Sequence, residues 1–215
     1  MGNVPTVEWF FDFISPFSYL QLECFDRLPR DTVVAFRPIL FAGLLDHWGH
    51  KGPAEIPEKR RFTYRHVQWM ADRDGIPMRF PPAHPFNPLP ALRLSIAAGC
   101  TPDAVRRIFR FLWRDGGNLA DPAGFAALGR TVGVADAAAA IQAPAVKDTL
   151  RANGDRARAL GLFGVPSLLV GGEIFWGYDA TGMAIDALND PGLLARGEIG
   201  RVSALPIGIE RGKSR

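Results

Sequence analysis

Two short segments, about 150 residues apart, restrict the fold of this chain more than any other feature. The first, residues 7–19, is an apolar run that continues through Ser15 and Pro16 into a helical pattern. The second, residues 163–167, contains a Val-Pro pair immediately before another apolar run. A nearly continuous apolar run indicates a strand buried on both faces of a sheet, and Ser before Pro is a common helix start. The first segment therefore predicts a central strand that leads directly into a helix.

The periodicity along the rest of the chain predicts an α/β protein. Two strand patterns flank the helix that begins at Pro16, which is the spacing of a βαβ unit. From about residue 43 the apolar residues recur at helical spacing, and a Gly-Gly turn later joins two further strands. The predicted strands are residues 7–13, 32–40, 167–170 and 173–176, and the predicted helices are residues 16–28, 57–74, 91–98, 101–112, 121–132, 145–160 and 182–188.

This order divides the chain into three predicted parts. Residues 1–42 and 160–195 supply the strands and flanking helices of one domain, and residues 43–159 form an all-helical insertion. Residues 196–215 form a tail with five basic and two acidic residues, so the tail carries 5 − 2 = +3, which equals the formal charge of the whole chain. A short basic tail without a groove-binding motif is usually a solvated end, so we expect no nucleic-acid partner.

The composition disfavours several other classes of protein. With 215 residues, of which 47% are hydrophobic, the chain can bury a substantial core. No apolar run approaches the roughly eighteen residues that span a bilayer, and the first residues lack a secretion signal, so we expect a cytoplasmic protein without a membrane partner. Cys24 and Cys100 are the only cysteines and form no Cys-x-x-Cys pair. A dithiol centre is therefore not expected. The histidines lack metal-ligand spacing, so we expect no metal site either.

Ser15 is the first candidate for chemistry. As part of a Ser-Pro pair it reads as an ordinary helix cap, like Thr101 and Asp121, which also precede proline. Its context differs, because the helix that it opens follows a buried strand. A helix N-terminus presents partial positive charge and unpaired N–H groups, and together with a hydroxyl donor it lowers a thiol pKa from its usual value of about 8.5. Ser15 can therefore both cap the helix and activate the thiol of a bound ligand.

The Val-Pro pair is the second candidate. Most X-Pro bonds are trans, and such a pair often does no more than open a strand. A cis bond before Pro166 would expose the backbone N–H and C=O of Val165 beside Ser15, where they can pair with an extended, peptide-like ligand. Glutathione is such a ligand.

Together these motifs resemble those of the 2-hydroxychromene-2-carboxylate isomerases and the kappa-class glutathione transferases, which are relatives of the periplasmic disulfide oxidoreductases. The resemblance extends to about residue 190. It rests on the helical insertion and on three motifs: Phe-x-Asp-x-x-Ser-Pro-x-Ser-Tyr over residues 10–19, Phe-Gly-Val-Pro-Ser over 163–167 and Phe-Trp-Gly-Tyr-Asp over 175–179. It implies a thioredoxin-like sheet of βαβ…ββα order, interrupted by a large all-helical insertion, with serine where a redox cysteine would stand.

The resemblance also implies a glutathione site. In it, Ser15 contacts the glutathione sulfur, and Val165, before a cis Pro166, pairs with the cysteinyl backbone. Lys59 and Asp179 hold the charged ends of the peptide. Without the resemblance, Lys59 reads as a solvated helix lysine and Asp179 as a helix cap.

Two residues are candidates for the substrate side of the site. Asn87 matches a family position there, although a lone loop asparagine more often forms a turn. Phe17 is among the aromatic residues that can supply an apolar wall, with core packing as its alternative.

The function implied by the resemblance is a glutathione-dependent cis–trans isomerase. Such an enzyme converts 2-hydroxychromene-2-carboxylate, or a related aromatic-derived compound, to trans-o-hydroxybenzylidenepyruvate in the breakdown of aromatic compounds. One alternative is a kappa-type glutathione transferase that acts on an electrophilic substrate. A second is a catalytically silent glutathione-binding protein, suggested by His50 and Ala180, where the chain departs from the family pattern. The resemblance further implies a homodimer that binds a small anionic aromatic substrate.

Overall fold

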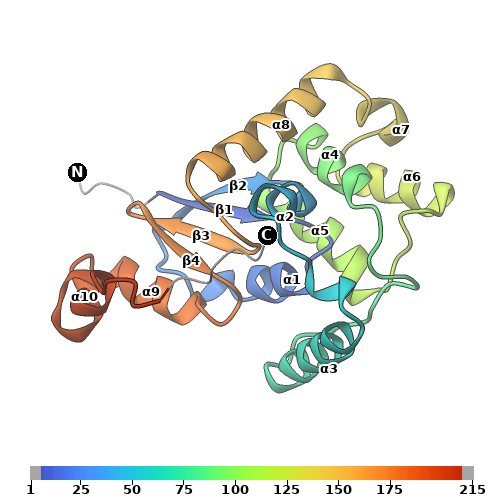
Figure 1. The fold of residues 1–215 in the computed structure, drawn as a ribbon. Helices are drawn as coiled ribbons and strands as arrows, with labels where there is room; N and C mark the ends of the chain where they lie inside the picture. Colours follow the sequence, from blue (N-terminus) through green and yellow to red (C-terminus); the bar gives the residue numbers. More distant parts are fainter. Residues whose placement is uncertain (1–5, 210–215) are drawn as a thin grey trace.

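The computed structural model describes residues 6–209, and the strands within this range form one four-stranded sheet (Figure 1). β1 (Thr6–Phe11) runs parallel to β2 (Val33–Pro38). β3 (Ser167–Val170) pairs antiparallel with both β1 and β4 (Glu173–Trp176). The order β2-β1-β3-β4 places β1 inside the sheet, as its apolar sequence predicts.

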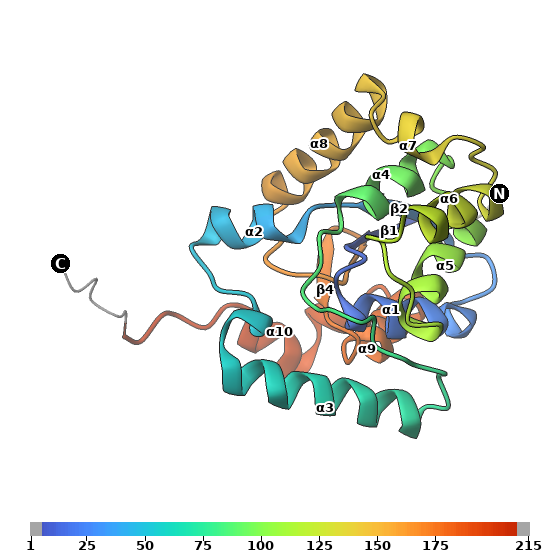
Figure 2. The ribbon, with the colours of Figure 1, turned by 90° about the vertical axis from the view of Figure 1, so that its right-hand side faces the viewer.

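Helices cover both faces of this sheet (Figures 1 and 2). α1 (Pro16–Glu23) and a 3₁₀ turn (Phe25–Arg27) connect β1 to β2. The segment between β2 and β3 is helical apart from its loops, and α9 and α10 follow β4. The remaining elements are α2 (Phe41–Trp48), a 3₁₀ turn (Pro53–Glu55), α3 (Pro57–Arg73), α4 (Leu89–Ala97), α5 (Pro102–Phe109), a π-helical turn (Arg110–Arg114), α6 (Pro122–Thr131), α7 (Ala137–Ala140), α8 (Pro144–Ala159), α9 (Thr181–Asn189), a 3₁₀ turn (Leu193–Ala195) and α10 (Gly197–Ser203).

The alternation of side chains along β1 builds two apolar clusters. Val7, Trp9 and Phe11 are fully buried in the larger cluster, together with residues of α1 and of the helical segment. Phe10 points to the opposite face, because successive side chains of a strand alternate, and it belongs to a smaller cluster formed by Phe10, Ile39, Leu44, Ala157, Leu162 and Val165. The end of β1 is therefore fixed from both faces of the sheet.

The predicted α/β fold, with a sheet interrupted by helices, is confirmed. β1 ends two residues earlier than the predicted strand, because the chain turns at Asp12, whose carbonyl accepts a hydrogen bond from Ser15 N at 3.0 Å. α1 ends at Glu23 rather than near Leu28, and its continuation is a 3₁₀ turn. The pattern did not predict α2, α7 or α10, which have only 8, 4 and 7 residues.

The division into two domains and a tail remains a prediction. The segment predicted as a tail contains α10, and the residues after this helix up to 209 are exposed. The rest of the predicted tail and the first five residues lie outside the described range. Within residues 6–209, no helix is both long enough and apolar enough to cross a bilayer.

Candidate active site

Ser15 caps the N-terminus of α1 and retains a hydroxyl hydrogen for a ligand. Its Oγ accepts a hydrogen bond from Ser18 N at 3.2 Å, and its side chain is mostly buried. Within residues 6–209, no acceptor takes the O–H of Ser15, and the N–H of Phe17 in the first turn also has no partner. Because a helix N-terminus favours negative charge, these two donors suit an anionic atom such as a thiolate sulfur.

Asp12 fixes the turn that carries Ser15. Its carboxyl group is fully buried and accepts hydrogen bonds from Ile14 N at 3.1 Å and from Phe41 N at 2.8 Å. Burial raises the pKa of this carboxyl group to about 7 from its ordinary value of 3.8, although the N–H donors act in the opposite direction. Asp12 therefore joins the β1–α1 turn to the first residue of α2.

Two side chains from the helical segment hold the same turn from its other side. Trp113 Nε1 donates to the Phe13 carbonyl at 2.8 Å, and His84 Nε2 lies 2.9 Å from the Ile14 carbonyl. Trp113 is fully buried. Consecutive carbonyls before Ser15 are thus both bonded to residues that are 70 and 100 positions away in the sequence.

Val165 and Pro166 lie at the same end of the sheet as Ser15. β1 and β3 are antiparallel with Phe10 opposite Ser167, so the residues after β1 and those before β3 lie at the same end of the sheet. The Val165–Pro166 bond is cis. Pro166 O accepts a hydrogen bond from Gly177 N, whereas the N–H and C=O of Val165 have no partner in the described part of the chain.

Asp179 lies in the turn between β4 and α9. A side chain of α1 holds this turn in place. Gln21 of α1 donates from Nε2 to Gly177 O at 2.9 Å and to Thr181 Oγ1 at 3.0 Å, while its Oε1 accepts from Trp9 Nε1 at 2.7 Å. Gly177 has φ +98°, and a Cβ there would lie 2.5 Å from Asp179 Oδ1, so the turn requires glycine.

The carboxylate of Asp179 is free to bind a ligand. Asp179 is exposed and, among the described residues, makes no hydrogen bond or ion pair through its side chain. It does not cap α9, because the residue at the cap position is Ala180. The structural reading of Asp179 as a helix cap is therefore wrong.

The other predicted residues lie in α1, in α3 and in the loop before α4. Lys59 is exposed in the first turn of α3. Phe17, in the first turn of α1, is half-buried and packs against the larger apolar cluster. Asn87 is exposed in the proline-rich loop between α3 and α4, residues 74–88, and its Oδ1 accepts a hydrogen bond from Leu89 N at 3.1 Å. This bond confirms the turn-forming reading of Asn87 and leaves its Nδ2 for other contacts.

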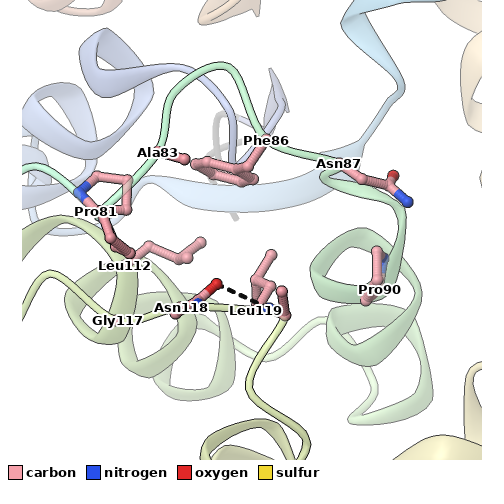
Figure 3. A pocket seen from close by; sticks show the side chains of 11 residues that line it. Pro81, Ala83, Phe86, Asn87, Pro90, Leu112, Gly117, Asn118 and Leu119 are labelled. Atoms are coloured by element: carbon pink, nitrogen blue, oxygen red, sulfur yellow. Dashed lines mark hydrogen bonds between the residues drawn. The ribbon is translucent and has the colours of Figure 1, made fainter.

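Asn87 also lines a cavity of about 380 Å³, shown in Figure 3. Phe86 and Ala83 come from the proline-rich loop, and Leu112 and Leu119 come from the segment that follows α5. The full lining is Pro81, Pro82, Ala83, Phe86, Asn87, Pro90, Leu112, Gly117, Asn118, Leu119 and Ala120. This lining is mostly apolar and carries amides but no charged side chain, so it suits an aromatic ring. Phe86, in the wall of this cavity, packs beside His84 and Trp113, whose side chains bond to the turn before Ser15.

The sequence did not single out Asp12, His84, Trp113 or Gln21 as parts of this site. Asp12 belongs to the motif of residues 10–19. A carboxylate inside an apolar run is the one sequence signal that could have indicated a special role for Asp12. The other three act through contacts distant in sequence, which a local pattern does not show. In residues 6–209, no group of three His, Cys, Asp or Glu side chains is arranged to hold a metal ion.

The fold and the site define a thioredoxin-like protein whose first helix begins with serine. The chain belongs to the family of DsbA-like thioredoxin domains, whose model matches residues 6–189. The 2-hydroxychromene-2-carboxylate isomerase of Sphingobium xenophagum is 29% identical over 181 residues, which are 81% of this chain and 93% of that protein. Human glutathione S-transferase kappa 1 is 27% identical over 184 residues, 77% of this chain and 81% of that protein.

A solved structure of 2-hydroxychromene-2-carboxylate isomerase has the same fold. It superimposes with a TM-score of 0.72 at 24% identity, covering 93% of this chain and all of that one. The resemblance to the isomerases and the kappa-class transferases is therefore confirmed. Proteins with these names are enzymes, and the chain is related to enzymes associated with glutathione.

Proposed function

We propose that this protein is a glutathione-dependent cis–trans isomerase that acts on 2-hydroxychromene-2-carboxylate or a closely related aromatic-derived acid and yields trans-o-hydroxybenzylidenepyruvate. The observation that carries the proposal is the free hydroxyl hydrogen of Ser15 at the same end of the sheet as the unpartnered backbone of Val165. The match to an isomerase of that name over 93% of its length supports the substrate class.

The free groups of Val165, Ser15 and Asp179 would bind glutathione together with Lys59 of α3. The N–H and C=O of Val165 would pair with the cysteinyl residue, as in the addition of a strand to a sheet edge. Asp179 would bind the ammonium group of the γ-glutamyl residue, and Lys59 would bind a carboxylate. Ser15 Oγ–H and Phe17 N–H would donate to the sulfur and favour its thiolate form.

The chemistry that bound glutathione supplies is reversible addition of its sulfur to the conjugated double bond, which permits rotation about that bond. The chain's own residues provide the remaining requirements. Ser15 and the N-terminus of α1 stabilise negative charge on sulfur, and the apolar cavity beside Phe86 and Asn87 accepts the aromatic ring. Phe17, in the first turn of α1, would contact the substrate close to the sulfur.

The deciding experiment mixes the purified protein with glutathione and 2-hydroxychromene-2-carboxylate and follows the ultraviolet spectrum. We expect the product spectrum to form only when glutathione is present. Conjugate formation with a chloroarene, without isomerisation, would instead indicate a kappa-type transferase, which the similarity to human glutathione S-transferase kappa 1 keeps as the second candidate. Calorimetric binding of glutathione without either reaction would indicate a silent binding protein, in keeping with the His50 and Ala180 departures.

We further propose that the enzyme is a cytoplasmic homodimer. The reducing cytoplasm keeps glutathione in its thiol form, and the dimer is inferred from the family resemblance alone. A monomer in analytical sedimentation at micromolar concentration would contradict the dimer without affecting the proposed reaction.

Replacement of Asp179 by asparagine should weaken glutathione binding without loss of stability. The exposed carboxylate has no partner among the described residues, so its removal breaks no contact of the folded protein. Loss of one charge-assisted hydrogen bond should lower the affinity about tenfold, as measured by calorimetric titration.

The matched control is D186N, which changes another exposed aspartate, within α9, by the same substitution. D186N should bind glutathione as the wild type does. Equal affinity of D179N and D186N would remove Asp179 from the glutathione site.

A further inference from the structure

The imidazole of His84 forms a hydrogen bond to the residue that precedes Ser15. Its Nε2 lies 2.9 Å from the Ile14 carbonyl oxygen. Because a carbonyl oxygen can only accept, Nε2 must carry the proton. In the neutral ring Nδ1 is then an acceptor, and it lies 2.6 Å from the hydroxyl oxygen of Tyr64. The same hydroxyl group also lies 2.9 Å from the His84 carbonyl oxygen, the second acceptor for its one hydrogen. The bond to Ile14 therefore defines the tautomer, and the contacts at both ring nitrogens define the ring orientation.

Aromatic neighbours hold this ring in place. The rings around His84 come from α3, from the proline-rich loop and from the π-helical turn, with centroids 5.2 to 6.4 Å away. They belong to Tyr64, Phe80, Phe86 and Trp113. Trp113 is fully buried and the other three rings are half-buried, so His84 cannot leave the Ile14 carbonyl without displacing packed side chains.

The peptide group that joins Ile14 to Ser15 is bonded at both of its polar atoms. The Ile14 carbonyl accepts from His84, and the Ser15 N–H donates to the Asp12 carbonyl. The preceding peptide group is also bonded at both ends, because the Phe13 carbonyl accepts from Trp113 and the Ile14 N–H donates to the Asp12 carboxyl group. The direction of the Ser15 side chain depends on the orientation of the preceding peptide group, because both are attached to the Cα atom of Ser15. Of these contacts, His84 acts on the carbonyl joined directly to Ser15 N.

We propose that His84 is a positioning residue that sets the direction of the Ser15 hydroxyl through the Ile14 carbonyl and links it to the cavity wall formed by Phe86. This role rests on the proposed function, in which the Ser15 hydroxyl donates to the sulfur of glutathione. His84 itself contacts neither the sulfur nor the reacting bond. Its contribution is geometric, and small displacements of a catalytic group cost much of the rate.

Two amide substitutions separate positioning from packing. The side-chain amide of H84Q reaches the place of Nε2 and can still donate to the Ile14 carbonyl. The shorter amide of H84N reaches only the place of Nδ1, so the bond to Ile14 is lost. Both variants lose the aromatic ring, and both should show a similar fall in melting temperature.

We expect H84N and H84Q to differ in activity while their melting temperatures are similar. We expect the turnover of H84N to fall about tenfold or more, and that of H84Q to stay within about threefold of the wild-type turnover. H84N should also raise the pKa of the bound glutathione thiol, which is measured by the absorbance of the thiolate. The exposed His66 on α3, changed to asparagine, controls for loss of a histidine remote from Ser15. Equal losses in H84N and H84Q, or wild-type turnover in H84N, would overturn the positioning role.

A readout in the ligand-free protein keeps this test separate from the proposed function. Nitrogen-15 spectra should show the wild-type His84 with its proton on Nε2, and the amide signals of Ser15 and Phe17 should move in H84N but not in H84Q. A wild-type protein that binds no glutathione would refute the proposed function while these shifts still support the positioning of Ser15. Unmoved signals in H84N would refute the positioning even in an active isomerase.

Discussion

The S15A variant is expected to lose about a hundredfold of its isomerase turnover, the usual cost of removing one donor that stabilises developing negative charge. Among residues 6–209, the hydroxyl hydrogen of Ser15 has no acceptor and lies at the N-terminus of α1. Its removal should also raise the pKa of the bound thiol, because a hydrogen bond to the thiolate favours the charged form. Thiolate absorbance of the glutathione complex as a function of pH measures this change.

The stability of S15A should fall much less than its activity. The lost bond to Ser18 N is an ordinary helix cap, worth about 1 kcal/mol, which for a chain of this size lowers the melting temperature by about 2–4 °C. T101A is the matched control, because Thr101 caps α5 ahead of a proline through the same 3.2 Å bond to a backbone N–H. T101A should show the same thermal shift and wild-type turnover. If S15A lost turnover only in proportion to its melting temperature, Ser15 would act as a helix cap and not in catalysis.

The D12N variant is expected to lower the free energy of unfolding and to change how that free energy depends on pH. The carboxyl group of Asp12 accepts two backbone N–H groups. An amide offers one acceptor and one donor, so one of these N–H groups would face another donor in a buried site. A buried unsatisfied group costs about 1–3 kcal/mol, and the disturbed groups belong to the turn that carries Ser15.

The pH dependence follows from the raised pKa of Asp12. A pKa raised from 3.8 to about 7 means that the folded state binds this proton more tightly than the unfolded state. The resulting stability is fully present below about pH 4 and is lost as the pH rises through about 7. The shift corresponds to about 4 kcal/mol of ionisation free energy.

Urea unfolding of the wild type and D12N at several pH values between 5 and 8 isolates this effect. Other titrating groups are common to both proteins, so their contributions cancel in the difference. We expect D12N to be less stable than the wild type at pH 5, and the gap to narrow towards pH 8. D186N, with an exposed aspartate changed, controls for the loss of a carboxylate. A gap that stays constant over this range would show that Asp12 does not titrate there.

Much of the fold was predictable because its signals are local. The apolar run before Ser15, the Ser-Pro start of α1 and the Gly-Gly turn between β3 and β4 each depend on neighbouring residues. The alternation along β1 likewise determines which of its side chains enter each apolar cluster. The helix α2 was missed because its start carries a weak signal: it follows Leu40, which makes no side-chain cap.

Ser15 and the Val-Pro pair were predictable as candidate site residues through their motifs, whereas the side chains that hold the Ser15 turn were not. Ser15 and the Val-Pro pair stand in recognisable sequences, and the antiparallel pairing of β1 with β3 brings them to one end of the sheet. His84 and Trp113 reach the Ser15 turn across 70 and 100 residues. Nothing in their local sequence indicates such a contact.

The sequence by itself determined the strands, most helices and the identity of the residue at the mouth of α1, because propensity, capping and apolar periodicity act over a few neighbouring residues. Only the tertiary structure decided how the Ser15 turn is held, since Asp12, His84 and Trp113 meet there through hydrogen bonds between distant segments. It also decided that Asp12 is buried, and burial is what raises its pKa. Such effects depend on which groups the fold removes from water, and a linear pattern does not contain that information.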